Sequence, residues 1–316
     1  MKNWLSNSEF VSKLKINLEK SGIPLELKTI NKVNNCGFEA WSHYYEDINE
    51  SGEVIYRELD VLASDIKSFT FEYSNCTVIL MNQLFIECKH LTDTDFIVFQ
   101  SEDKNLYSFP LGFSGSYLIS RDEYFKFPLI IKKVAEVDLT KIDKSDNFKD
   151  RTTNDACNQL MSAIYSEYKE NDLKLDFKKT VDKLKYEYRI KNVPDFQEKI
   201  SIKKVLENQN VLMLVNYYPI LVINDNMEII KAEYDVENGK IINFENVGFG
   251  IYPFTSMKEY NKPFLRSINV IITNYNYLEQ ILHMVNEYSK KLLMNIKNDF
   301  YSENGEQKNN FLREIY

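Results

Sequence analysis

Two stretches of the sequence decide the fold: residues 56–63, Tyr-Arg-Glu-Leu-Asp-Val-Leu-Ala, and residues 84–90, Leu-Phe-Ile-Glu-Cys-Lys-His. Each has the apolar run of a strand inside a sheet, and each carries charged side chains near its end. Because side chains two residues apart on a strand share a face, Glu87 and Lys89 are expected to project together. Asp60, near the end of the neighbouring strand, is expected to reach the same place.

This arrangement has the parts that phosphodiester hydrolysis needs. Carboxylates from Asp60 and Glu87 can hold a hard divalent cation, since Mg²⁺ commonly uses one or two carboxylates with water and substrate phosphate. Such a metal lowers the pKa of bound water and stabilises charge on the phosphate. The Lys89 ammonium can position that water or neutralise developing negative charge. The sequence therefore predicts a metal site with a catalytic lysine beside it.

The Glu-x-Lys triplet alone is weak evidence, because residues 26–28, 102–104 and 167–169 have the same spacing. The triplet at residues 87–89 differs because it ends an apolar strand and follows another apolar strand that carries an acid. Charges in that setting are costly unless they are paired or bind a metal. The alternative interpretation is that the three charged residues form an ordinary ion-pair cluster at a sheet edge.

Helical and strand patterns surround the two stretches. They predict a helix from Ser6 or Ser8 that Gly22 and Pro24 end, then a hairpin, an irregular segment, two more strands and an amphipathic helix. The hairpin strands are expected at residues 40–48 and 53–62, with a turn at 49–52. The irregular segment is expected at 64–83, the two further strands at 84–89 and 95–100, and the amphipathic helix at 153–168. The C-terminal half is expected to hold two paired strands, a third strand and a long helix, at residues 211–224, 227–234, 268–273 and 277–296. One α/β domain with a C-terminal elaboration is the simplest account.

The order of helix, hairpin with Arg-Glu-Leu-Asp, strand ending Ile-Glu-Cys-Lys, strand and helix resembles the PD-(D/E)xK nuclease superfamily, which includes many restriction endonucleases. The resemblance covers roughly residues 9–168. It implies an α/β fold whose restriction-endonuclease-like core, a mixed central sheet flanked by helices, occupies residues 1–170. Residues 171–316 would be a C-terminal α/β elaboration that completes the core or packs on it.

The resemblance also implies roles for individual residues. Asp60 and Glu87 match the metal-binding acids, Lys89 matches the catalytic lysine, and Mg²⁺ or Mn²⁺ is the implied cofactor. The chain departs from the family's pattern in two respects. The interval between Asp60 and Glu87 is long, which implies an insertion around residues 66–78, and no proline precedes Asp60.

Other polar residues are weaker candidates for the same site. Glu58 lies two residues before Asp60 on the same strand face, and Gln159 lies on the later helix. Glu19 lies on the first helix, where Glu9 is the alternative, and first-helix acids approach the metal in some of the nucleases that the chain resembles. For each of them a solvated surface residue is the plainer interpretation.

A basic segment, residues 174–204, is the expected nucleic-acid contact because lysines, arginines and interleaved tyrosines can follow phosphates. The residues expected to contact the nucleic acid are Lys178, Lys179, Lys183, Lys185 and Arg189. A solvated, charged helix face explains the same pattern equally well. The net charge of −8 argues against a protein that coats nucleic acid indiscriminately, but not against a local basic groove.

The cysteine and histidine content, the N-terminus and the lack of long apolar stretches limit the expected metal sites, location and partners. The chain has 4 Cys and 3 His and no Cys-x-x-Cys pair, so a closed structural zinc site is not expected. Scattered cysteines and an N-terminus without a signal-type apolar core favour a cytoplasmic location. No apolar stretch is long enough to cross a bilayer, so no membrane partner is expected.

Together these features predict an enzyme, a metal-dependent endonuclease or exonuclease that hydrolyses nucleic-acid phosphodiester bonds, with DNA as the expected substrate and restriction or genome defence as the expected setting. The alternative is a catalytically inactive nuclease fold that serves as a nucleic-acid-binding sensor or scaffold, although the intact set of Asp60, Glu87 and Lys89 argues against it. A structural or partner-binding protein is a third hypothesis, which leaves the strand-end acids unexplained. A homodimer, and a protein partner bound through the C-terminal half, both stay open.

Overall fold

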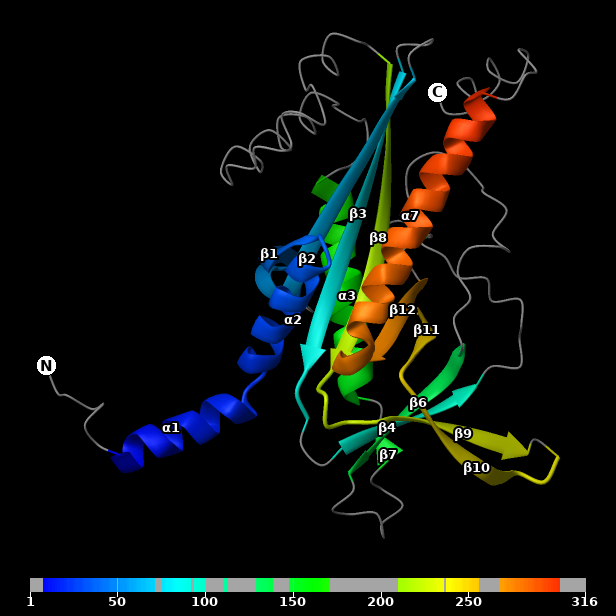
Figure 1. Ribbon diagram of the computed structural model, residues 1–316. Helices are drawn as coiled ribbons and strands as arrows, with labels where there is room; N and C mark the ends of the chain where they lie inside the picture. The colour runs from blue at the N-terminus through cyan, green and yellow to red at the C-terminus, as the bar shows by residue number, and fades with distance from the viewer. Residues whose placement is uncertain are drawn as a thin grey trace, which may run out of the picture.

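The computed structural model describes residues 8–49, 51–71, 76–91, 94–100, 111–112, 129–138, 148–149, 151–170, 210–235, 237–255 and 267–301. Two β-sheets and the helices packed on them make up this part of the chain (Figure 1). The helices are α1 (Ser8–Lys20), α2 (Ile23–Asn35), α3 (Arg151–Glu170), the short 3-10 helix η5 (Tyr275–Tyr277) and α7 (Leu278–Tyr301).

The larger sheet has the strand order β1-β2-β3-β8-β12-β11, and the short β5 pairs with β8. Its strands are β1 (Glu39–Ile48), β2 (Val54–Phe71), β3 (Cys76–Lys89), β5 (Leu111–Gly112), β8 (Asn210–Ile223), β11 (Phe249–Thr255) and β12 (Ser267–Asn274). The pairs β1–β2, β2–β3 and β11–β12 are antiparallel, whereas β8 is parallel to both β3 and β12. β8 pairs with β3 along its whole length, so a strand from the C-terminal half lies in the middle of the sheet.

The smaller sheet has the strand order β10-β9-β4-β6-β7. Its strands are β4 (Thr94–Gln100), β6 (Ile131–Asp138), β7 (Phe148–Lys149), β9 (Ile229–Asp235) and β10 (Lys240–Val247). β4 and β9 are parallel, and the other pairs are antiparallel. This sheet too combines strands from both halves of the chain.

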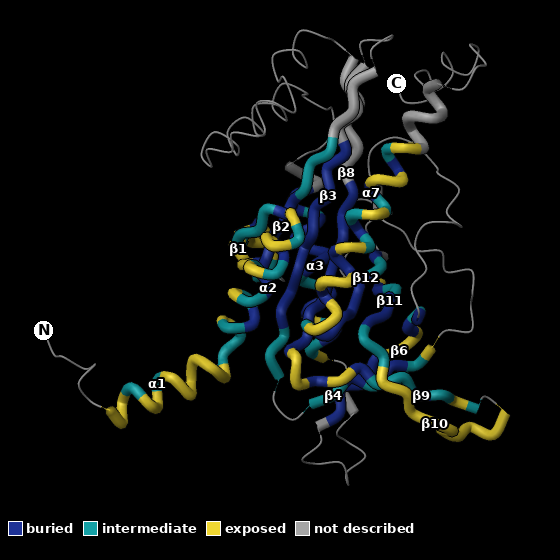
Figure 2. Tube along the Cα trace, viewed as in Figure 1, coloured by how far each residue is buried: buried dark blue, intermediate teal, exposed yellow. Residues whose placement is uncertain are grey.

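Helices cover both faces of the larger sheet. Leu160 of α3 packs in one hydrophobic core with Phe85 of β3. Leu25 of α2 and Leu282 of α7 pack in a second core with Ile86, the next residue of the same strand. Figure 2 shows the central strands as a buried layer between these helices. The mixed sheet flanked by helices, and with it the expected α/β class, is confirmed.

Most of the predicted elements are confirmed. The hairpin, the strand that ends at Lys89, the strand at residues 95–100 and the helix at residues 153–168 are found as β1 with β2, β3, β4 and α3. In the C-terminal half, β12 and α7 match the predicted third strand and long helix. The first helix is confirmed as α1, but α2 begins directly after it, with Pro24 in its first turn.

The prediction of an irregular segment at residues 64–83 is wrong. Residues 64–71 continue β2 and residues 76–83 begin β3, and the two strands form one long antiparallel arm in which Ser64 lies opposite Gln83. Of the residues 66–78, where an insertion is expected from the resemblance, the described ones, 66–71 and 76–78, lie in the extended part of this arm.

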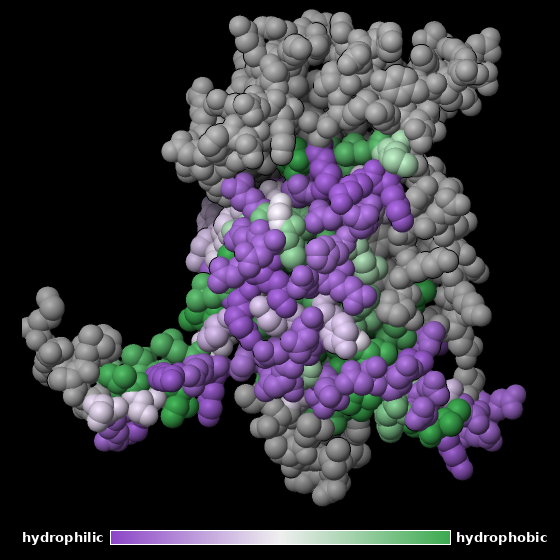
Figure 3. All heavy atoms as spheres, in the orientation of Figure 1, coloured by the Kyte–Doolittle hydropathy of each residue, from purple (hydrophilic) through white to green (hydrophobic). Residues whose placement is uncertain are grey.

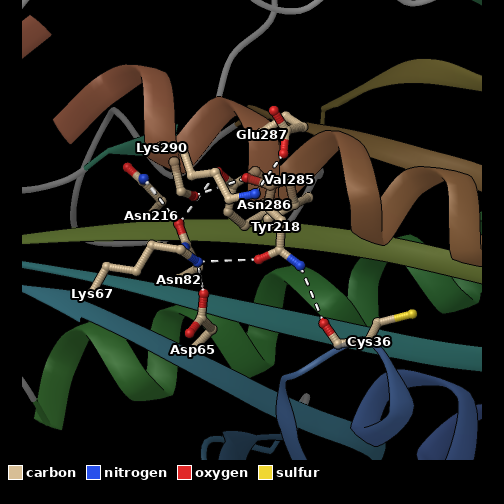
Figure 4. A network of polar contacts seen from close by, with 11 residues as sticks. Cys36, Asp65, Lys67, Asn82, Asn216, Tyr218, Val285, Asn286, Glu287 and Lys290 are labelled. Atoms are coloured by element: carbon tan, nitrogen blue, oxygen red, sulfur yellow. Dashed lines mark hydrogen bonds and ion pairs between the residues drawn. The ribbon is translucent and has the colours of Figure 1, made fainter. Parts of the chain in front are cut away.

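Buried polar side chains account for the broken apolar pattern in the arm (Figure 4). Asn82 is fully buried, and its side-chain oxygen accepts hydrogen bonds from Asn216 Nδ2 at 3.2 Å and from the Tyr218 hydroxyl at 3.5 Å. Lys67 Nζ donates to Asn286 Oδ1 of α7 at 3.1 Å. Partners from β8 and α7 thus contact the side-chain oxygen of Asn82 and the ammonium of Lys67, whereas Asn82 Nδ2 has no hydrogen-bond partner among the described residues.

The predicted pairing of the strands at residues 211–224 and 227–234 is also wrong. β8 lies between β3 and β12, whereas β9 belongs to the smaller sheet. The chain turns between them at Asn224, whose carbonyl accepts the Met227 N–H at 3.1 Å. A nearly continuous apolar run such as β8 is typical of a parallel strand buried on both faces rather than of a hairpin strand.

α1 has no buried residue. Phe10, Ile16 and Leu18 keep almost half of their surface exposed, and Figure 3 shows apolar atoms along this helix at the lower left. No helix in the described part of the chain is both long and apolar enough to span a membrane.

Candidate active site at Asp60 of β2 and the end of β3

Glu87 and Lys89 project from the end of β3 on the face that α3 covers. Phe85, two residues before Glu87, packs in the core under α3. Ile86 and Cys88 pack on the opposite face, in the core under α2 and α7. This is the alternation that the sequence predicts. Because β2 and β8 lie on the two sides of β3, the sheet rather than a loop positions both charged side chains.

The Glu87 carboxylate is buried, with only 1% of the residue exposed. Its Oε2 accepts a hydrogen bond from Lys89 Nζ at 2.9 Å. Its Oε1 has no hydrogen-bond partner in the described part of the chain. Burial, and then the nearby Asp60 carboxylate, raise the pKa of Glu87 to about 8, although Lys89 opposes the shift. A buried oxygen without a partner is a costly feature that a ligand at this place would relieve.

Asp60 lies in a β-bulge. The register of β1 against β2 shifts between Trp41 and His43. Across this shift two residues of β2, Asp60 and Val61, lie opposite the single residue Ser42. Bulges of this kind bend a strand and redirect a side chain, and they are frequent beside functional sites.

The redirected Asp60 carboxylate is held by the main chain of β3. Its Oδ2 accepts the Cys88 N–H at 2.6 Å. Burial raises the pKa of Asp60, while this hydrogen bond and the charge of Lys89 lower it by less. The bulge and the hydrogen bond together place one carboxylate beside the other.

Lys89 links the two acids to α3. Besides Glu87, its Nζ contacts Gln159 Oε1 at 3.2 Å. Burial lowers the pKa of Lys89, but the attraction of Glu87 and Asp60 outweighs burial and the pKa is raised. The ammonium therefore stays charged at neutral pH. Gln159, a secondary candidate from the sequence, is brought into the site.

A further acid, Glu26 of α2, approaches the site and was not among the predicted residues. Burial raises its pKa, and the neighbouring Asp60 raises it further. Its carboxylate also acts on the pKa of Glu87. α2 buries Leu25 and Thr29 against the sheet, which leaves Glu26 at the border of its buried face. The Glu-x-Lys triplet at residues 26–28 was visible in the sequence, but the helix that carries it was not predicted.

The other acids suggested by the sequence lie farther out. Glu58 is exposed on β2 and acts on Asp60 only through its charge. Glu19 and Glu9 are exposed on α1, near Lys15 at 3.7 Å and Lys13 at 2.7 Å. Figure 1 shows α1 extending away from the larger sheet, so the structure does not bring either of its acids to the site.

A polar groove of ≈ 620 Å³ lies beside this cluster, between the β1–β2 hairpin and the first half of α3. Lys89 and Gln159 line it, so the groove leads directly to the ammonium that contacts Glu87. Two further cations, Arg57 and Arg151, also line it. A substrate in this groove would meet Lys89 from the α3 side.

The donors available suit a hard divalent cation. Asp60 and Glu87 offer two carboxylates, and Mg²⁺ is commonly bound by one or two with water and substrate phosphate completing its shell. Within the described residues, no group of three or more His, Cys, Asp or Glu side chains lies close enough to hold a metal. The free Oε1 of Glu87 is the observation that fits a bound cation. Asp60 and Glu87 are therefore the residues that would hold it.

The basic residues predicted to contact nucleic acid, Lys178, Lys179, Lys183, Lys185 and Arg189, lie outside the described residues. Comparisons of the chain with protein-family models, with curated proteins and with solved structures find no match.

Proposed function

We propose that this chain is a metal-dependent nuclease, built on a restriction-endonuclease-like core, that hydrolyses phosphodiester bonds in nucleic acid, with DNA as the expected substrate. The observation that carries the proposal is the buried carboxylate of Glu87, with one oxygen on Lys89 and the other without a partner in the described chain. An ordinary ion pair gives no reason for the second oxygen to stay unsatisfied. A cation bound at Glu87 would give this oxygen a partner.

Each residue of the cluster has a distinct part in this proposal. Mg²⁺ or Mn²⁺ at Asp60 and Glu87 would activate a water molecule and offset charge on the phosphate. Lys89, charged and facing the groove, stabilises negative charge that develops on the phosphate oxygens. Gln159 holds the Lys89 ammonium toward the groove. Glu26 adds negative charge beside the acids and favours cation binding.

The direct test is cleavage of supercoiled plasmid and of labelled linear DNA and RNA, with Mg²⁺, with Mn²⁺ and with EDTA. We expect metal-dependent cleavage by the wild type. Glu87→Gln and Lys89→Met should each lower the rate by at least about 100-fold. The matched control is the exposed Glu9–Lys13 ion pair of α1, which has a similar contact distance of 2.7 Å. Glu9→Gln and Lys13→Met should cleave like the wild type.

Metal binding gives a readout that does not depend on turnover. Titration calorimetry with Mn²⁺ should show binding to the wild type and a loss of at least about tenfold in affinity for Asp60→Asn. The asparagine keeps an oxygen that can accept the Cys88 N–H, so the fold should be retained. Absence of both metal binding and cleavage in the wild type would leave the cluster as a structural ion pair. Nucleic-acid binding without cleavage would favour the scaffold alternative.

A further inference from the structure

The groove beside Lys89 has two arginines on its walls whose arrangement the catalytic cluster does not explain. Arg57 comes from β2, in the hairpin, and Arg151 is the first residue of α3. Neither contacts Glu87 or Asp60 in the described structure, yet both share the groove with Lys89. Three cations from three elements therefore line one cavity.

Arg57 is held in a fixed orientation. Its Nε donates to Asp47 Oδ2 at 2.8 Å, and the other oxygen of Asp47 accepts the Ile48 N–H at 2.9 Å. Asp47 is 9% exposed whereas Arg57 is 43% exposed. The buried acid thus orients an arginine that faces solvent. The contact uses one of the five N–H donors of the guanidinium, and arginine commonly presents the others in pairs to phosphate oxygens.

Arg151 stands where a cation is unfavourable for the helix itself. The N-terminal end of a helix carries partial positive charge, so arginine in the first turn is mildly destabilising. Its ion pair with Asp155 is long, at 3.7 Å, and both side chains are largely exposed. Such a pair contributes little to stability and exchanges readily for another anion. An anionic ligand in the groove would explain why a cation stands at this position.

We propose that this groove binds one strand of the nucleic-acid substrate by its backbone, with Arg57 and Arg151 on phosphates that flank the phosphodiester at Lys89. The inference rests on the proposed function, since it assigns the path of the strand to the same site. The Asp47 and Asp155 carboxylates offset much of the charge of the two arginines, so the groove attracts anions only locally. This agrees with the net charge of −8, which disfavours indiscriminate coating.

The test is binding of a fluorescein-labelled DNA oligonucleotide, single-stranded and duplex, followed by anisotropy in EDTA over a range of salt concentrations. Arg151→Gln and Arg57→Gln should each weaken binding by about tenfold. Each should also reduce the magnitude of the slope of the log association constant against log salt concentration by about one, because each variant loses a phosphate contact. The control Lys13→Gln removes an exposed helix cation from α1 and should leave both quantities unchanged.

Removing Arg57 alone takes the Arg57 ion pair away from the buried Asp47, which can destabilise the hairpin. The double variant Asp47→Asn, Arg57→Gln avoids this and should bind as weakly as Arg57→Gln. A parallel cleavage series separates binding from chemistry. The arginine variants should raise KM by about tenfold with kcat little changed, whereas Lys89→Met should lower kcat.

The outcomes distinguish the two proposals. If the wild type binds and cleaves DNA, and every arginine variant keeps its affinity and salt slope, the groove is not the path of the strand and the nuclease proposal stands. If the wild type binds without cleaving, and the arginine variants lose affinity, the groove is supported and the nuclease proposal fails. If the wild type neither binds nor cleaves nucleic acid, both are overturned.

Discussion

A carboxyl group as deeply buried as that of Glu87 is costly to ionise, and its pKa of about 8 against an ordinary 4.5 reflects this cost. The unfolded chain exposes the group, which then titrates near its ordinary value. The folded protein therefore binds an extra proton between about pH 4.5 and pH 8. Protonation of Glu87 therefore stabilises the folded protein. This contribution to the free energy of unfolding is fully present below the pKa of Glu87 in the unfolded chain and is lost as the pH rises through about 8.

The variant Glu87→Gln removes this titration. In EDTA we expect the free energies of unfolding of variant and wild type to be similar near pH 5. By pH 9 the variant should be more stable by something on the order of 3 kcal/mol, measured by urea denaturation. Glu19→Gln, on the exposed α1, is the control and should stay within about 0.5 kcal/mol of the wild type. A difference between Glu87→Gln and the wild type that does not change with pH would contradict the buried-carboxyl account.

At the scale of single residues, the sequence predicts some positions in the site and not others. Alternation along one strand placed Glu87 and Lys89 on one face, because that placement depends only on the strand period of two. Glu26 and Arg57 were not proposed for the site. Their positions depend on where α2 lies against β2 and on how β1 pairs with β2. Neither relation is a local property of the sequence around them.

At the scale of elements, the position of α3 decides whether Gln159 and Arg151 reach the site. Glu136 of β6 fixes the beginning of this helix. Its Oε1 accepts the Thr153 N–H at 2.6 Å and the Thr153 hydroxyl at 2.9 Å, and its Oε2 accepts the Thr152 N–H at 3.3 Å. A carboxylate here satisfies N–H groups that the first turn cannot pair within the helix, and it suits the positive end of the helix dipole.

We expect Glu136→Ala to lower the free energy of unfolding by about 1–3 kcal/mol, because it leaves buried donors of α3 without an acceptor. Glu136→Gln should cost less, since its amide oxygen can still accept. Urea denaturation followed by circular dichroism measures both changes. Glu233→Ala, at a half-exposed position on β9 of the same sheet, is the control and should stay within about 0.5 kcal/mol of the wild type. If the Glu136→Ala protein were as stable as this control, the stability of α3 would not depend on the hydrogen bonds that Glu136 accepts at the beginning of the helix.

The long arm of β2 and β3 shows why an element can escape prediction. Its polar residues interrupt the apolar pattern by which strands are recognised. In the folded protein Asn82 finds partners on β8, and Lys67 finds one on α7. These partners lie more than 130 residues away along the chain. Polar residues in the middle of a sheet are stable only through such distant partners, so a local pattern predicts a loop instead.

At the scale of the whole molecule, the two sheets are joined where β11 runs beside the residues that lead into β6. Ile251 donates its N–H to the Leu129 carbonyl at 2.9 Å. A Cβ on Gly250 would lie 2.9 Å from Ile131 Cδ1 and 3.2 Å from the Leu129 oxygen. The glycine thus permits the main chains of the two sheets to approach closely.

Gly250→Ala should lower the free energy of unfolding of the whole protein by about 1–3 kcal/mol, because the added methyl group overpacks a buried contact. Gly22→Ala is the control, because Gly22 has an ordinary helical φ of −65° and only the flexible Glu26 side chain lies near its Cβ. That variant should stay within about 0.5 kcal/mol of the wild type. Differential scanning calorimetry measures both, and equal stability of the two variants would mean that the sheets can separate to admit the methyl group.

The sequence by itself determined those features that depend on neighbours along the chain. These are the strand hairpin, the amphipathic character of α3, and the shared face of Glu87 and Lys89. Each of them follows from a period of two or of 3.6 residues and from turn residues within a short window. That information was sufficient for the α/β class and for a candidate pair of charged residues.

Only the tertiary structure decided which strands are neighbours and what surrounds the pair. It placed β8 against β3, formed the bulge that turns Asp60 toward Cys88, and assembled a groove from the hairpin, β3 and α3. Each of these depends on contacts between segments far apart in the chain. Packing against a common core sets such contacts, and many sequences with the same local periods could satisfy them differently.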